Sequence, residues 1–400
     1  MPSLVLATPI TSGQLVNIRV GDGVDLPNGS GSQVRLDVYD VTYSGGAPAS
    51  VSLSQTIVLP SATNASGMSP PASGNRWLVQ GGTAAGEGGL TLSSDGNYMA
   101  LVGYNTCYAG TTGAGATCQT NGTGGTGNTG QRVVGVLNLG TGTVDTSTDF
   151  TVGTSSAIRN AFTTDGTNIW TATSASGVRY TTLGSATSTA LTGTGNERRE
   201  YVYNGQLYTS RMSGTIDGVA TVGTGTPSSG TQTVTLLPGL PTSTNSIYDY
   251  YFADANTLYM VDDRNSTSGG LEKWTFNGST WTQVYNLPAA GTTGLKSLAG
   301  FTDSAGNVVL FAASVGTNAN ILYGYGDTLS NTNVANVVAN QLVDSSTAFG
   351  GATNTWNLRG VAIAPGTVIV PEPSTAVLMP IAAVALLSRR RAKMVPELFS

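Results

Sequence analysis

The sequence predicts an all-β protein, a six-bladed β-propeller with seven blades as the alternative. Charged residues make up only 10% of the chain and glycine accounts for 54 of its 400 residues, while short runs rich in Val, Leu, Ile and Tyr recur between turn residues. This composition and spacing do not suit a helical protein. The runs also repeat roughly every 40 to 50 residues with about four strands in each repeat, which is the period of propeller blades.

The repeated unit is a strand, a tight turn and a second strand. The turn carries Asp-Gly or Asn-Gly at 95–96, 165–166 and 204–205, because a tight reversal needs residues that tolerate positive φ. Two further copies of the unit lie at 250–261 and 298–312. The outer strands of these units are expected in the runs 133–139, 148–152, 178–183, 218–222, 233–237, 271–276, 281–287, 321–325 and 336–343.

The two ends of the predicted propeller complete one blade. Strands expected at 15–20, 33–39 and 51–59 lack a first strand, whereas the run 358–366 is a first strand with nothing after it. If the last strand joins the first three, no sheet edge is left open where the ring closes. A short run at 77–80 would belong to a degenerate seventh blade. An irregular β-solenoid or two β-sandwiches are the alternative architectures.

The end of the chain has three unlike pieces in a fixed order. Pro371, Glu372 and Pro373 are followed by an apolar run at 376–387 and then by three arginines at 389–391. The apolar run is shorter than the ~20 residues that comfortably cross a bilayer. The basic cluster behind it indicates a cytoplasmic end, so the preceding chain is expected on the other side of the membrane. A plain C-terminal anchor is the alternative to the interpretation that follows.

This tail resembles the PEP-CTERM sorting signal of bacterial exported proteins. The resemblance implies that an exosortase-type enzyme recognises Pro371, Glu372 and Pro373, removes the short transmembrane helix and passes the protein to the cell surface or extracellular matrix. The chain departs from the pattern by continuing after the arginines, from 392 to 400. The expected organisation is an N-terminal remnant at 1–9, a propeller at 10–366, a linker at 367–373, a sorting and transmembrane segment at 374–391 and a cytoplasmic tail at 392–400.

Export also requires an amino-terminal signal with a basic start and an apolar core. Residues 1–9 contain neither Lys nor Arg and only a short apolar run. We therefore expect the natural start of translation to lie upstream. In an exported protein, Cys107 and Cys118 are expected to form a disulfide, because both fall in one Gly/Thr/Asn-rich insertion at 103–131 and oxidising compartments favour such bonds.

The composition restricts the possible chemistry. The chain has no histidine and a net charge of −5, which excludes a Ser-His-Asp triad and His-ligated zinc and argues against nucleic-acid binding. An enzyme would need paired carboxylates, for which Asp22, Glu87 and Asp249 are the best candidates. Asp262 and Asp263 are a weak calcium candidate; their oxygen-rich loop lacks the spacing of a known ligand motif. No cofactor is expected.

A set of basic residues recurs at one register of the repeats. Arg159, Arg198, Lys296 and Arg359 each stand six or seven residues before the turn that ends the first strand of a unit, although the chain has only 17 basic residues. In a propeller the first strands line the central channel, so these side chains should surround one of its mouths. They would form either an ion-pair ring with Glu87 and Asp249 or a socket for an anionic group such as an acidic polysaccharide.

The sequence therefore predicts an exported propeller at the cell surface or in the matrix, transiently anchored in the membrane. Its expected role is binding or structural and non-catalytic, for example in an exopolysaccharide or biofilm matrix. The alternative is a surface hydrolase or lyase that acts on carbohydrate through carboxylates in the channel.

Overall fold

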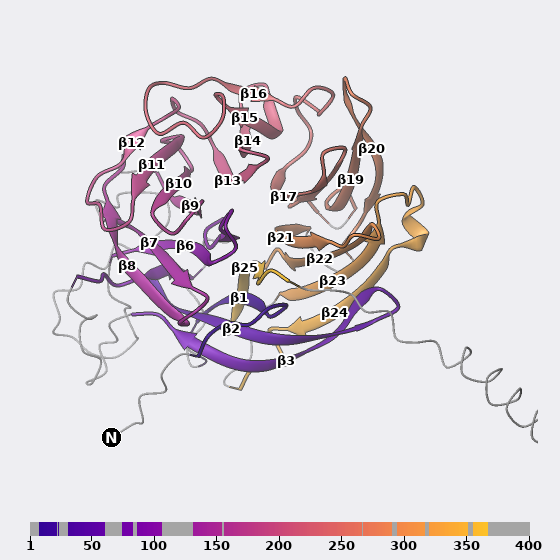
Figure 1. Cartoon of the computed structure of the whole chain (residues 1–400), viewed down its shortest axis with the longest axis horizontal. Coiled ribbons are helices and arrows are strands. Elements are labelled where there is room, and N and C mark those ends of the chain that lie inside the picture. The colour runs from indigo at the N-terminus through magenta and orange to yellow at the C-terminus, as the bar shows by residue number, and fades with distance from the viewer. Residues whose placement is uncertain are drawn as a thin grey trace, which may run out of the picture.

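The computed structural model describes residues 8–21, 23, 31–60, 74–82, 86–105, 131–153, 156–265, 267–289, 294–316, 320–350 and 355–366. Within these ranges the chain is all-β: its regular elements are strands and one short 3₁₀ helix, η1 (Val334–Asn336). The sheets are arranged around a common centre in the manner of a propeller (Figure 1). The predicted fold class is thus confirmed at this level.

Four sheets are separate and have four antiparallel strands each. In every one of them the first strand lies nearest the centre and the others follow outward (Figure 1). Their strands are β9 (Ile158–Thr163), β10 (Asn168–Thr173), β11 (Val178–Thr182) and β12 (Thr189–Ala190); β13 (Glu197–Tyr203), β14 (Gln206–Ser213), β15 (Ile216–Val222) and β16 (Val234–Leu236); β17 (Ile247–Asp254), β18 (Thr257–Asp262), β19 (Gly270–Phe276) and β20 (Trp281–Leu287); and β21 (Leu295–Thr302), β22 (Asn307–Ser314), β23 (Ile321–Thr328) and β24 (Val338–Asp344).

The remaining strands form one continuous sheet of nine. It contains β25 (Asn357–Ile363), β1 (Leu15–Val20), β2 (Gly31–Ser44), β3 (Ala47–Val58), β4 (Val79–Gly81), β5 (Leu90–Leu92), β6 (Tyr98–Tyr104), β7 (Arg132–Asn138) and β8 (Thr143–Phe150). The expectation that the last strand joins the first three is confirmed, because β25 pairs antiparallel with β1, placing Leu15 opposite Ile363.

The number of separate blades differs from the prediction. Six separate four-stranded sheets were expected, but only four are found among the described residues, because β4 pairs with both β2 and β6 and joins two groups of strands. The run at 77–80 that suggested a seventh blade corresponds to β4, which is only three residues long. It acts as a bridge and not as a blade.

The turns between first and second strands form as the sequence predicts. Gly96, Gly166 and Gly205 have φ values of 73°, 78° and 75°, which residues with a Cβ adopt only with difficulty. In the turn that follows β9, Asp165 accepts hydrogen bonds from the backbone nitrogens of Thr167 (2.9 Å) and Asn168 (2.8 Å). The carboxylate therefore replaces backbone partners that a tight reversal leaves unpaired.

Hydrophobic clusters fill the spaces between neighbouring sheets. Near the ring closure, Leu15, Val361 and Phe311 belong to one buried cluster that joins β1, β25 and β22. The β2–β3 hairpin is longer than the other outer hairpins and runs along the outside of β24 (Figure 1). Asn340 donates a side-chain hydrogen bond to the carbonyl of Pro48 at 2.8 Å, which fixes this hairpin to the neighbouring sheet.

Several predicted features lie outside the described residues. These are residues 1–7 of the N-terminal remnant predicted at 1–9, residues 106–130 of the insertion with Cys107 and Cys118, the Pro371–Pro373 motif, the expected transmembrane segment and the tail that follows it. In the part of the chain that the structure describes, no helix has the length and apolar character needed to cross a membrane.

Candidate functional site

The four basic residues predicted to surround the channel lie at the same end of the central strands. Arg159 is in β9, Arg198 in β13, Lys296 in β21 and Arg359 in β25, each among the first three residues of its strand. We call this end the mouth. Its charged groups do not project into an open channel, because contacts with neighbouring sheets occupy them.

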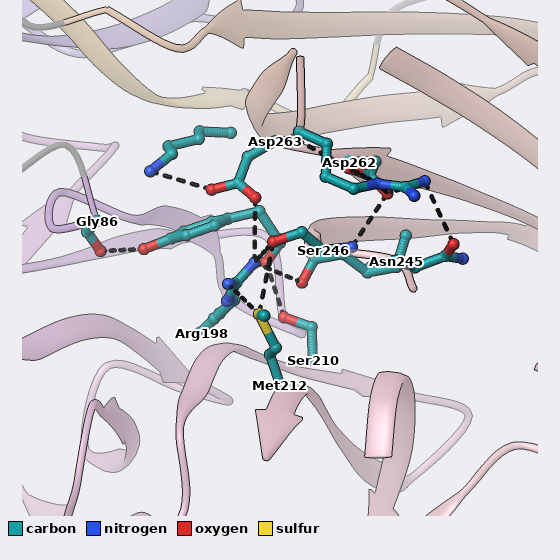
Figure 2. A network of polar contacts seen from close by, with 12 residues as sticks. Gly86, Arg198, Ser210, Met212, Asn245, Ser246, Asp262 and Asp263 are labelled. Atoms are coloured by element: carbon teal, nitrogen blue, oxygen red, sulfur yellow. Dashed lines mark hydrogen bonds and ion pairs between the residues drawn. The ribbon is translucent and has the colours of Figure 1, made fainter. Parts of the chain in front are cut away.

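Tyr248 closes the middle of the mouth. This residue of β17 is only 2% exposed, and its hydroxyl donates a hydrogen bond to the carbonyl of Gly86, which lies before β5 in another sheet (Figure 2). Three cations surround the ring: Cζ of Arg198 at 4.7 Å, Cζ of Arg199 at 5.3 Å and Nζ of Lys296 at 4.8 Å from its centroid. These distances allow a cation–π attraction.

Asp263 neutralises two of these cations. Its carboxylate lies 3.5 Å from Nη1 of Arg198 and 3.1 Å from Nζ of Lys296. Burial alone would raise the pKa of Asp263, but Lys296 and Arg198 lower it below its ordinary value. Asp262 faces away and pairs with Arg264 at 2.8 Å (Figure 2). The described residues contain no group of three or more metal-ligating side chains, so the structure adds no support for calcium here.

Arg199, which the sequence analysis did not single out, makes the most extensive connection. Its Nε donates to Asp249 at 3.0 Å, its Nη1 to the carbonyl of Arg159 at 3.1 Å and its Nη2 to the carbonyl of Lys296 at 3.3 Å. Burial raises the pKa of Asp249, while the charge of Arg199 and a hydrogen bond from the backbone of Leu298 oppose that rise. One guanidinium thus joins four central strands.

Arg359 and Glu87 form a second buried group at the mouth. Arg359 is 7% exposed and donates to the carbonyls of Gly81 at 2.6 Å and Gly82 at 3.0 Å. Glu87 accepts hydrogen bonds from the backbone nitrogen of Gly81 at 3.0 Å and from the hydroxyl of Tyr104. Burial raises the pKa of Glu87, although Tyr104 and the nearby charge of Arg359 favour its ionised form.

Arg159 is half-buried and donates to the side-chain oxygen of Asn196. Next to it, Glu197 is fully buried, and its closest cation is Arg211 at 3.6 Å. Burial raises the pKa of Glu197 to about 7 despite the opposing charge of Arg211. Among the described residues, neither Arg159 nor Arg359 forms an ion pair with a carboxylate.

The predicted pairing of the ring is therefore corrected in two respects. In the ion-pair ring, Glu87 and Asp249 were expected to neutralise the four predicted residues together, but the ion-pair partner of Asp249 is Arg199. Asp263, considered only for calcium, neutralises Arg198 and Lys296 instead. The available sequence signal for Arg199 was the Arg-Arg pair at 198–199, since adjacent residues of a central strand point to different neighbours. The position of Tyr248 had no comparable signal.

Two small cavities lie at the centre of the described part of the propeller. A cavity of about 20 Å³ is lined by Glu87, Arg199 and Arg359, and one of about 60 Å³ by Glu200 and Asp249 among others. Ligand pockets usually measure about 300–1,000 Å³, so these spaces suit water. Glu87 and Asp249, the predicted enzymatic carboxylates, line different cavities, and Asp22 lies outside the described residues. Glu200, which lines the larger of the two cavities, is fully buried, and this burial raises its pKa well above the ordinary value.

Comparisons with known proteins add little to this picture. No family model and no curated protein matches the chain. One similar solved structure is that of a "putative 6-phosphogluconolactonase" from Bacteroides uniformis, which is 10% identical, covers 84% of each chain and has a TM-score of 0.42. At this level of similarity the neighbour carries no argument about function.

Proposed function

We propose that this chain is an exported propeller of the cell surface or extracellular matrix that has a binding or structural role and performs no catalysis at its centre. The observation that carries the proposal is the closed mouth, where Tyr248 and Arg199 occupy the space between the sheets. The cavities of about 20 and 60 Å³ beside them are too small for a sugar chain.

The proposal includes a six-bladed architecture. Within the nine-stranded sheet, β25, β1, β2 and β3 follow one another as four antiparallel neighbours, and so do β5, β6, β7 and β8. We count each group as one blade and β4 as a bridge between them. Together with the four separate sheets this gives six blades.

Export and sorting are supported by the resemblance of the tail to PEP-CTERM signals. Intact-mass analysis of the protein secreted by its native host tests this part. The mature form should lack residues 389–400, and Glu372→Ala should leave an uncut form in the membrane, because the Pro-Glu-Pro region is the expected recognition element. Recovery of the complete C-terminus from the matrix would reject the sorting signal.

A depolymerisation assay decides between the binding role and the hydrolase alternative. The purified chain is incubated with acidic and neutral polysaccharides, and the release of reducing ends or unsaturated products is measured. We expect no release above a buffer control. Release that disappears in both Glu87→Gln and Asp249→Asn would establish catalysis by channel carboxylates and overturn the proposal.

Binding of an acidic polysaccharide across the outside of the closed mouth is the second candidate function, and the charge of the mouth favours it. Five basic residues, Arg159, Arg198, Arg199, Lys296 and Arg359, face three carboxylates, Glu87, Asp249 and Asp263. The excess of about two positive charges attracts a polyanion, and this attraction weakens with salt. Arg159→Gln should reduce retention on alginate while preserving the melting temperature, since Arg159 is the half-buried member without an ion pair. Unchanged retention would reject the mouth as the anion site.

A further inference from the structure

A second potential binding site lies away from the centre. A groove of about 410 Å³ is formed between the tip of the β2–β3 hairpin, with Gly45 and Gly46, and the loop that joins β23 to β24, with Thr328, Ser330, Thr332 and Asn336. Its volume falls within the usual range of ligand pockets. We infer that this groove binds a neutral oligosaccharide segment.

The groove carries no free charge. Asp327 is the single ionisable residue in its lining, and the ammonium group of the fully buried Lys273 lies 3.1 Å from its carboxylate. The hydroxyls of Tyr259 and Tyr285 donate to the same carboxylate oxygen. Because the buried Lys273 neutralises Asp327, the one acid of the lining, the groove offers no cation to an anionic ligand and no anion to a cationic one.

The loop that forms one wall is held in place from within. Nζ of Lys273 donates to the carbonyls of Thr328 at 2.7 Å and Asn331 at 2.8 Å. The amide of Asn331 donates to Asp327 at 2.6 Å, and its oxygen accepts a hydrogen bond from the side chain of Asn336 at 3.2 Å. A wall that is already ordered loses little conformational entropy when a ligand binds.

The lining matches the chemistry of a sugar. Thr328, Ser330, Thr332 and Asn336 are exposed, and hydroxyl and amide groups both donate and accept hydrogen bonds, as sugar hydroxyls do. Val338 is 43% exposed at the same groove and provides an apolar surface for the C–H face of a sugar ring. The ligand class is therefore neutral and rich in hydroxyls.

This inference rests on the proposed extracellular role, which would bring the groove into contact with matrix polysaccharide, but it uses a different part of the molecule. The two sites also differ in their response to salt. Binding at the mouth depends on positive charge and weakens as salt increases, whereas binding in an uncharged groove does not.

The test is affinity electrophoresis of the full chain in gels that contain dextran or another neutral glucan, supported by a glycan array. We expect retention that is the same in 50 and 500 mM NaCl. Thr332→Leu with Asn336→Leu should reduce it about tenfold, the loss expected when a pair of ligand hydrogen bonds is removed. The matched control is Thr282→Leu with Gln283→Leu, which changes an exposed hydroxyl and amide on β20 outside the groove.

The control variant should bind like the wild type, and Arg159→Gln should also leave neutral retention unchanged. Absence of neutral-glycan binding, equal losses in groove and control variants, or retention that falls with salt would each overturn the inference. If neutral binding is absent while alginate retention and C-terminal processing persist, the groove fails and the proposed function stands. Catalytic release at the centre would reject the proposed function without affecting the groove.

Discussion

The polar groups at the two ends of the central strands find their hydrogen-bond partners in different ways. At the mouth, a side chain from one sheet satisfies groups in several others, as Arg199 does for Asp249 and the carbonyls of Arg159 and Lys296. At the opposite end, Asp303 accepts hydrogen bonds from the backbone nitrogens of Ala305 and Asn307, both at 2.9 Å. Arg199 at the mouth therefore couples strands of four sheets, whereas the carboxylate of Asp303 stabilises its own turn, and mutations of these two residues should differ greatly in their effect on the free energy of unfolding.

The largest effect is expected from Arg199→Ala. It leaves the buried Asp249 without its cation and should lower the free energy of unfolding by about 3–5 kcal/mol. Chemical denaturation measures this loss. Arg179→Ala is the control, because among the described residues Arg179 bonds only to Ser188, in the loop that leads into β12 of the same sheet, and its loss should cost about 1 kcal/mol. Equal losses in the two variants would contradict the special role of the mouth.

The burial of Glu197 at the mouth should also make the free energy of unfolding depend on pH in an unusual way. Since burial raises the pKa of Glu197 from 4.5 to about 7, the folded state binds a proton that the unfolded state releases. This contribution is complete below pH 4.5 and is lost as the pH rises to about 7. Glu197→Gln should therefore be more stable than the wild type by about 1–3 kcal/mol at pH 8 and similar to it at pH 4.

Thermal melts across this pH range check the prediction. Part of the decrease in melting temperature with rising pH should remain in Glu197→Gln, because burial also raises the pKa of Glu272 to about 7. An unchanged slope would show that Glu197 does not carry a proton in the folded protein at neutral pH.

The smallest effect is expected at the turns. Asp303→Asn keeps an acceptor oxygen and should change the free energy of unfolding by no more than about 0.5 kcal/mol at pH 7. Although burial raises the pKa of Asp303, hydrogen bonds from Asn307 and Ala305 together lower it below its usual 3.8. The turn contribution is thus present above about pH 4 and disappears as the carboxylate protonates in stronger acid. A loss at pH 7 comparable to that of Arg199→Ala would remove the contrast between the two ends.

Local patterns explain what the sequence predicted well. The turns around Asp95 and Asp165 depend on residues a few positions apart, so their sequence indicates their geometry, and the same holds for the strand runs. The pairing of β25 with β1 was predictable because the three strands at the N-terminal end lacked a first strand of a blade, and the run at 358–366 was such a first strand without the other three. The register of Arg159, Arg198, Lys296 and Arg359 correctly indicated a shared end of the central strands.

Long-range details were not predictable in the same way. The hydrogen bond from Tyr248 to Gly86 joins residues 162 positions apart, and no local pattern specifies which acid pairs with which base. The bridging role of β4 depends on how two sheets approach each other, so the run at 77–80 alone does not distinguish a bridge from a strand of a seventh blade. The groove combines a hairpin tip and a loop that are separated by almost 300 residues of chain.

A double-mutant cycle between Arg199 and Asp249 tests most directly whether the mouth is a structural hub. The free energies of unfolding of Arg199→Ala, Asp249→Ala and the double variant are compared with that of the wild type by chemical denaturation. The account predicts that the double variant loses less than the sum of the single losses, with a coupling of about 1–3 kcal/mol, because removing both partners leaves no buried unpaired charge. Single losses that add to within about 0.3 kcal/mol would contradict it.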